Sequence, residues 1–187
     1  MCTFADKNPG NPEATERFQR IALAYETICS DRQFSERTAD AFAAEDFLYA
    51  AEEGDLDEIR SLMEADVDIF TVDRWGFTAL HKAAQRGHWR IVDVLLQHSA
   101  APILVKMTIK LGGSTALHLA AEKSHHRVIE SLLRCCSVRE FLDIRERHSN
   151  RTALEIARAR YESSVKYGGD ATADQISLNL LLRYYDT

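Results

Sequence analysis

The sequence contains few of the features that would indicate a membrane, secreted or disulfide-bonded protein. Across its 187 residues no apolar run approaches the roughly 18 residues that a transmembrane helix requires. The N-terminus has no basic segment followed by an apolar stretch, so no secretory signal is expected. The four cysteines, Cys2, Cys29, Cys135 and Cys136, have spacings that fit neither a disulfide framework nor a zinc site. These absences predict a reducing compartment, cytoplasmic or nuclear, and no membrane partner.

Motifs of the common catalytic sites are also missing. The chain has no nucleophile elbow and no His-Glu-x-x-His sequence. Gly112 and Gly113 precede a predicted helix, but the lysine of a phosphate-binding loop does not follow them. Among seven histidines, His125 and His126 are adjacent, and on a helix they would point about 100° apart, which is unsuitable for holding one ion. We therefore expect no enzymatic activity, no cofactor and no metal.

A repeated tetrapeptide is the most informative feature that is present. Thr-Ala-Leu-His occurs at residues 78–81 and again at 115–118, and a degenerate copy, Thr-Ala-Leu-Glu, occupies residues 152–155. The copies are spaced 37 residues apart. Self-similarity at such a period predicts a stack of repeated structural units.

The residues around the tetrapeptide predict a pair of helices in each unit. Thr78 and Thr115 stand where a hydroxyl can cap the first helix, and small residues such as Ala83 and Ala84 allow close helix packing. Gly87, like Gly54 in an earlier unit, fits the positive φ that often ends a helix. The second helix is predicted from an apolar stripe that comprises Ile91, Val92, Leu95 and Leu96. A single pair cannot bury both faces, so each unit should lean on its neighbours.

The unit from Asp73 to Leu96 resembles an ankyrin repeat, because it has the Gly-x-Thr-x-Leu-His-x-Ala-Ala start and the Gly-His mid-turn of that family. The resemblance implies an all-α ankyrin-repeat solenoid of about four helix-turn-helix units, at about 45–73, 74–109, 110–146 and 147–187. It also implies that the imidazoles of His81 and His118 bond the preceding threonine hydroxyl and the adjacent loop, and that His88 is structural.

Two parts of the solenoid depart from the best unit. The connecting fingers at about 99–113 and 136–150 are each 4 residues longer than the first, and we expect the added length to extend the finger face. The fourth unit is the weakest, with an insertion after Ala157 and a second-helix stripe predicted from Ile176, Leu180 and Leu181.

Charge is concentrated in the first unit. Residues 45–73 contain 1 basic and 11 acidic side chains, a net charge of −10 within a chain of net charge −6. One interpretation is a polar capping repeat that keeps the end of the solenoid hydrated. The other is a docking surface for a basic partner. No aromatic and basic strip appears, so nucleic acid is not expected as a partner.

The ankyrin resemblance implies a protein partner bound on the concave face, by the finger tips and the ends of the inner helices. The corresponding positions are Arg74, Trp75, Phe77, Gln85, Arg86, Leu111, Ser114, Glu122 and Lys123, with Glu52 and Glu53 in the first unit. Trp75 is notable because tryptophan often dominates the binding energy of an interface. It could equally pack on the neighbouring finger.

Residues 1–44 do not follow the repeat and resemble the second half of a J-domain over about residues 5–31. The match comprises Asp6 and Lys7 in the loop, followed by an apolar helix at about 13–29 that contains Phe18, Ile21 and Tyr25. Phe4 and Ala5 stand where the family has its His-Pro, so we expect a remnant that does not stimulate a heat-shock chaperone. We also expect the helix to dock on the exposed edge of the first repeat.

Together these features predict a non-catalytic protein–protein interaction scaffold or adaptor. The alternative is a J-domain-type co-chaperone, in which the arm delivers a client held by the repeats to a heat-shock chaperone. A truncated product without an independent role is a third interpretation.

Overall fold

The computed structural model describes residues 42–135 and 139–185. The chain divides into two units, Met1–Phe42 and Ala43–Thr187, and the second holds nearly all of the described residues. The predicted J-like segment, including Asp6, Lys7 and the proposed helix at 13–29, lies outside the described residues.

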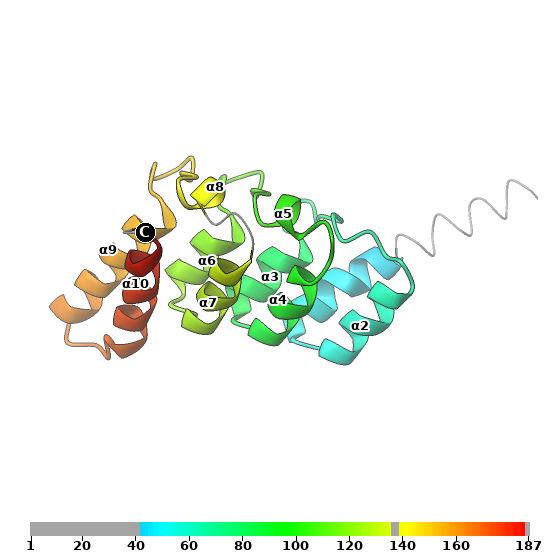
Figure 1. Cartoon of the computed structure of the whole chain (residues 1–187), viewed down its shortest axis with the longest axis horizontal. Coiled ribbons are helices and arrows are strands. Elements are labelled where there is room, and N and C mark those ends of the chain that lie inside the picture. Colours follow the sequence, from blue (N-terminus) through cyan, green and yellow to red (C-terminus); the bar gives the residue numbers. More distant parts are fainter. Residues whose placement is uncertain (1–41, 136–138, 186–187) are drawn as a thin grey trace, which may run out of the picture. The chain divides into compact units, whose positions relative to one another are not determined.

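The described residues are helical, with no strand among them, which confirms the predicted all-α solenoid. Residues 42–53 form a helix that is paired with α2 (Leu56–Glu64). The next pairs are α3 (Ala79–Arg86) with α4 (Trp89–Leu96), α6 (Ala116–Glu122) with α7 (His126–Arg134), and α9 (Ala153–Lys166) with α10 (Thr172–Tyr185). These pairs stand side by side in chain order (Figure 1).

The repeated tetrapeptide caps the first helix of its unit, as predicted. The backbone N–H of His81 donates to the Thr78 hydroxyl at 3.3 Å, and His81 Nδ1 lies 2.8 Å from that hydroxyl. On its other side the imidazole donates from Nε2 to the carbonyl of Met107 in the following finger, at 3.1 Å. His118 repeats the contact to Thr115, at 2.7 Å, but its buried Nε2 has no partner among the described residues. The predicted bond to the loop is thus formed by His81.

The core lies between the helix pairs and consists of the apolar positions that the repeat predicts. Ala83 and Ala84 are 0% exposed, so the first helices of adjacent units approach closely. Ile91, Val92 and Leu95 of the second helix are also buried. Since each unit contributes only one side of each interface, its stability depends on its neighbours.

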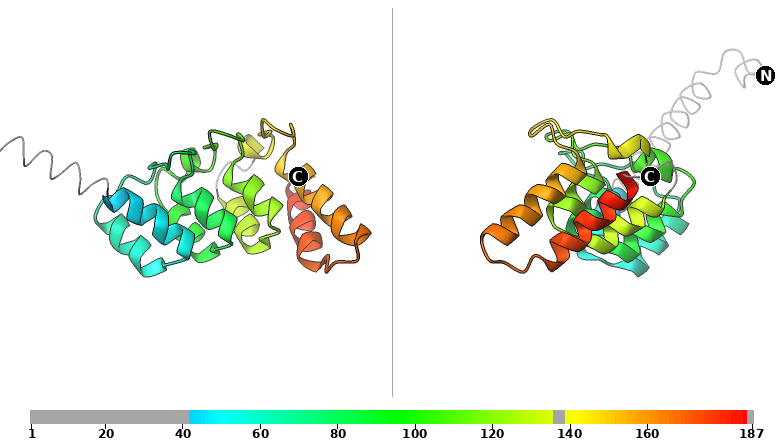
Figure 2. Two further views of the ribbon diagram at one scale, coloured as in Figure 1. Left: turned by 180° about the vertical axis from the view of Figure 1, so that it is seen from behind. Right: turned by 60° about the vertical axis from the view of Figure 1, so that its left-hand side comes forward.

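The two longer fingers each contain a short helix that the sequence did not reveal. These helices are α5 (Ala101–Leu104) and α8 (Arg139–Leu142), and they lie on the same side of the row of helices (Figures 1 and 2). Leu104 and Leu142 are buried in them, at 1% and 3% exposure. Part of the added length therefore turns inward and enlarges the core, which was not predicted. That the longer fingers extend the finger face stays a prediction.

In the last unit, the buried apolar stripe predicted from Ile176, Leu180 and Leu181 is only partly correct. Leu181 is fully buried, but Ile176 is 44% exposed. The buried face of α10 comprises Asp174, Ser177, Leu178 and Leu181. Two of these residues, Asp174 and Ser177, are polar, so apolar residues at helical spacing do not mark the buried face. The inserted residues lengthen both helices, which have 14 residues each compared with 8 in α3 and α4.

A glycine and a histidine join consecutive units at the first two interfaces. Gly54 and Gly87 adopt φ values of 90° and 84°, as predicted for helix ends. A Cβ on either would lie 2.7–2.8 Å from the imidazole of the next unit, His88 or His125 respectively. The imidazoles of His88 and His125 also form hydrogen bonds with the carbonyls of Glu52 and Gln85, at 2.9 and 3.1 Å respectively. The glycine therefore allows both the helix end and the close approach of the ring.

The third interface uses different chemistry at the equivalent position. Ser124 replaces the glycine and still adopts a positive φ of 58°. Its hydroxyl donates to the buried carboxylate of Asp174 at the start of α10, and Ser164 of α9 donates to the other oxygen of this carboxylate. Arg160 Nε lies 3.7 Å away. A serine–aspartate contact thus joins the last unit to the third.

Candidate protein-binding surface

Trp75 is held at the tip of the first finger by its own backbone and by the next finger. The Asp73 carboxylate accepts from the N–H groups of Trp75 and Phe77, at 3.0 and 2.9 Å. Gly76 completes the turn with a φ of 88°, and Lys110 of the following finger donates its N–H to the Trp75 carbonyl at 2.9 Å. The backbone is thus fixed while the indole remains 42% exposed. The guanidinium of Arg74 lies 3.8 Å from the ring centroid.

The helix of residues 42–53 presents a second exposed aromatic side chain. Phe47, Ala50 and Ala51 form its buried face, so Tyr49 points away from the core and is 66% exposed. An exposed tyrosine on a rigid helix supplies a large contact area at little cost in side-chain entropy.

These two aromatic residues line the same open cavity, which has a volume of about 400 Å³. It is bounded by the helix of residues 42–53, the first finger and α3, and its lining residues are Glu45, Asp46, Leu48, Tyr49, Glu52, Asp73, Trp75 and Lys82. Four of these residues carry carboxylates and one carries an amine, so the cavity is negatively charged.

Ion pairs engage the carboxylates nearest to α3. Lys82 Nζ lies 2.9 Å from Glu52 and 3.3 Å from a buried oxygen of Asp73, the second contact being an ion pair without hydrogen-bond geometry. Arg86 also donates to Glu52, at 2.5 Å. Hydrogen bonds from Lys82 and then Arg86 hold the pKa of Glu52 below its usual value. At the rim, Glu45 and Asp46 are exposed and form no ion pair within the described part of the chain.

The predicted binding residues differ in their accessibility. Those at the surface are Arg74, Trp75, Arg86, Leu111, Glu122 and Lys123. Phe77 and Gln85 are half-buried, and the Phe77 ring packs edge-on against His81 with centroids 6.2 Å apart. Ser114 is 7% exposed, and its hydroxyl donates to Glu146 at 3.0 Å. A role for these residues in partner binding stays a prediction, and the burial of Ser114 leaves little of its side chain for a partner.

Sequence reasoning missed most of the cavity. It selected Trp75 and Glu52 but not Tyr49, Asp73 or Lys82. The signal for Tyr49 was available, because the buried Ala50 and Ala51 define the inner face of the helix and place Tyr49 outside it. The contact of Lys82 with Asp73 could not be read from the sequence, since it depends on how the finger folds back over α3.

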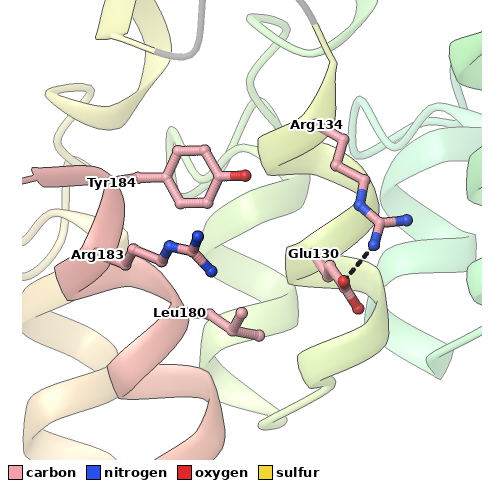
Figure 3. Close-up of a pocket in the computed structure, with 5 residues that line it drawn as sticks. All are labelled: Glu130, Arg134, Leu180, Arg183 and Tyr184. Carbon is pink, nitrogen blue, oxygen red and sulfur yellow. Dashed lines mark hydrogen bonds and ion pairs between the residues drawn. The ribbon is translucent and has the colours of Figure 1, made fainter. Parts of the chain in front are cut away.

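A second cavity of about 310 Å³ lies between α7 and α10. Figure 3 shows Arg183 and Tyr184 of α10 directed toward the ion pair of Glu130 and Arg134 on α7, with Leu180 beside them. Its charges are mixed, and Arg134 already donates to Glu130 at 2.5 Å. This cavity therefore lacks the net negative charge and the two exposed aromatic residues of the cavity beside Trp75.

Residues 42–135 and 139–185 show the features of neither a metal site nor a membrane span. In these ranges no group of three or more His, Cys, Asp or Glu side chains is arranged to hold a metal ion. None of the helices described is both long and apolar enough to cross a membrane.

Comparison with known proteins supports the resemblance seen in the sequence. Residues 47–138 match the family described as ankyrin repeats, in 3 copies. The chain is 41% identical over 49 residues to the nuclear factor NF-kappa-B p105 subunit of Rattus norvegicus. Among proteins of Mus musculus, it is 48% identical over 50 residues to the 60 kDa lysophospholipase and 39% identical over 56 residues to the 2-5A-dependent ribonuclease.

These alignments cover 26–29% of this chain and only 5–9% of the relatives, so they concern the repeats and not whole proteins. Two of the relatives have enzyme names, but ankyrin repeats are typically non-catalytic interaction modules, which act through their surface. The matched family, the helix pairs and the capped threonine motifs agree, and the chain is thus identified as one that carries ankyrin repeats over residues 47–138.

Proposed function

We propose that this protein is a non-catalytic scaffold or adaptor that binds a protein partner at the finger and inner-helix face of its first two repeats. The observation that carries the proposal is the open cavity that Tyr49 and Trp75 both line, with each side chain exposed to solvent. Interfaces derive most of their binding energy from a few large side chains, and exposed aromatics on a fixed backbone supply such anchors.

The proposal is tested by removing both aromatic side chains from the full chain. A partner captured by the immobilised protein would be identified, purified and titrated against the unchanged chain and against Tyr49→Ala with Trp75→Ala. We expect a loss of about 30-fold or more in affinity, which corresponds to about 2 kcal/mol. The melting temperature should stay nearly constant, because both side chains are largely outside the core.

A matched control replaces two exposed apolar side chains of the last repeat, Tyr167→Ala with Ile176→Ala. These side chains have similar exposure but lie away from the cavity, so the control should bind as tightly as the unchanged chain. Equal affinity of the Tyr49 and Trp75 variant, or equal loss in both variants, would place the binding site elsewhere.

The co-chaperone alternative depends on Asp6 and Lys7, which lie outside the described residues, and no observation of the repeats favours it. We keep the expectation that the chain does not stimulate a chaperone ATPase, and the location in cytoplasm or nucleus is likewise an expectation from cysteine usage.

A further inference from the structure

We infer that the cavity beside Trp75 receives a basic and partly apolar linear segment of a protein partner. An arginine or lysine side chain pairs with the exposed carboxylate of Glu45 or Asp46, and an apolar neighbour of that residue packs on Tyr49 and Trp75. The inference rests on the proposed function and adds the chemical class of the partner to it.

The cavity carries negative charge that the described part of the protein does not compensate. Lys82 is shared between Glu52 and Asp73, and Arg86 adds a second cation to Glu52. Glu45 and Asp46 form no ion pair within the residues that the structure describes, so two negative charges remain available at the rim. The surrounding residues 45–73 carry 11 acidic side chains and 1 basic side chain, which extends the negative field beyond the cavity.

The cavity also combines aromatic and acidic side chains. The guanidinium of Arg74 lies 3.8 Å from the centroid of the Trp75 ring, so this indole already accepts a cation–π contact on the exposed finger. Arginine and lysine have an apolar stem and a charged head. A cavity that offers Tyr49 and Trp75 beside Glu45 and Asp46 complements both parts of such a side chain.

The same features disfavour other occupants. Nucleic acids and acidic peptides would meet repulsion from the rim carboxylates. A purely apolar segment would cover Glu45 and Asp46 without pairing them, and desolvating an unpaired charge is costly. The sequence alone left a capping role and a basic-partner role open for the acidic unit. The cavity favours the second, although the two roles are compatible.

The inference is tested with defined peptide probes on the full chain. The probe is a short fluorescein-labelled peptide in which arginine alternates with leucine between glycine and serine ends. Two companion peptides carry glutamine or glutamate in place of arginine. The chain has two tryptophans, so a Trp89→Phe background leaves Trp75 as an intrinsic fluorescence reporter of its own surroundings.

We expect the arginine peptide to bind about tenfold more tightly than the glutamine peptide, a difference of about 1.4 kcal/mol, and to quench or shift Trp75 emission. Raising the salt concentration should weaken this preference, because the rim charges are exposed. Glu45→Gln with Asp46→Asn should reduce the preference to about twofold or less. Glu58→Gln with Glu64→Gln, which removes two exposed acidic charges from α2, should leave it nearly unchanged.

Several results would overturn the inference: no binding of the arginine peptide, equal binding of the glutamine peptide, or preference for the glutamate peptide. Equal losses in both charge variants would also overturn it, since the attraction would then come from net charge and not from the cavity. If arginine selectivity fails while the captured partner still requires Tyr49 and Trp75, only the inference falls. If the partner binds without both aromatics, the proposed function itself falls.

Discussion

The first two interfaces between repeats and the last one use different residues at the equivalent position, where one unit contacts the next. At the first two, a glycine of positive φ receives the imidazole of the next unit, and Gly87 with His125 is representative. At the last, Ser124 occupies the glycine position and donates its hydroxyl to the buried Asp174. The backbone conformation is conserved from unit to unit along the chain, with φ values of 84° and 58°, whereas the contact across it changes.

This difference follows from the Cβ atom, which Ser124 has and glycine lacks. An imidazole at the last interface would clash with the Cβ of Ser124, just as a Cβ at Gly87 would lie 2.8 Å from His125. The carboxylate of Asp174 is smaller than an imidazole, and it accepts a hydrogen bond from the hydroxyl of Ser124. The cost is a buried charge, which Ser164 and Arg160 help to compensate. At this position the last unit is therefore joined by charge-assisted contacts, whereas the earlier units are joined by an imidazole packed on a glycine.

The largest expected effect distinguishes a central core from the terminal one. Leu95 and Leu181 are both 0% exposed, so each change to alanine should cost about 2–5 kcal/mol locally. Leu95→Ala lies in a unit with neighbours on both sides, so it should lower the stability of the whole array. Leu181→Ala should mainly release the last helix pair.

Hydrogen exchange read by mass spectrometry separates these outcomes, because it reports each helix. Ile176→Ala, on the same helix as Leu181 but 44% exposed, is the control and should change stability by less than about 0.5 kcal/mol. Uniform loss of protection in Leu181→Ala would show that the last unit is as tightly coupled as the central ones.

The response to acid should also separate the two kinds of region. Burial lowers the pKa of His81 from 6.5 to about 4, and it lowers the pKa of His118 and His125 as well. As pH falls below 6.5, the unfolded chain binds a proton that the folded His81 does not, so the unfolding free energy falls by about 3 kcal/mol by the time pH 4 is reached.

The Asp174 contact should persist to lower pH than the histidine contacts. Burial raises the pKa of Asp174, but the hydrogen bonds from Ser124 and Ser164 and the charge of Arg160 lower it more, so it lies below 3.8. A depressed folded-state pKa gives stability that is present above the unfolded value and is lost as pH falls through the folded one. As the pH falls from about 7 to 4, the central repeats should therefore lose stability before the last one. Urea unfolding over this pH range measures the loss. A flat profile in that range would contradict a neutral, buried His81.

A smaller effect is expected from disrupting either of the two kinds of interface contact. Gly87→Ala should destabilise by about 1–3 kcal/mol, because a Cβ is strained at a φ of 84° and displaces the His125 ring. Ser124→Ala keeps its Cβ and loses only a hydrogen bond, so we expect about 1–2 kcal/mol and a higher pKa for Asp174. Thermal unfolding at neutral and acidic pH measures both. A Ser124→Ala variant with unchanged acid sensitivity would contradict the role assigned to its hydroxyl.

Features set by residues close together in the chain were predicted, and contacts between residues far apart in the chain were mostly missed. Caps such as Thr78 and glycines such as Gly87 were predicted because the residue and its backbone requirement are adjacent in the chain. The helix period of α10 was misread because Asp174 and Ser177, which are polar, face inward. Their burial depends on partners in other helices, such as Ser124. The cavity was only partly predicted, since Lys82 and Asp73 meet through the folding of the finger.

The repeat, its helix pairs, their caps and the fold could be predicted from the sequence, because each of these follows from short-range periodicity and from backbone preferences of individual residues. The three-dimensional arrangement was needed to show which acidic residues are paired, that Tyr49 and Trp75 line one cavity, and that Ser124 contacts Asp174 50 residues away. Those contacts depend on how units stack, and stacking brings together side chains whose separation in the chain carries no local signal.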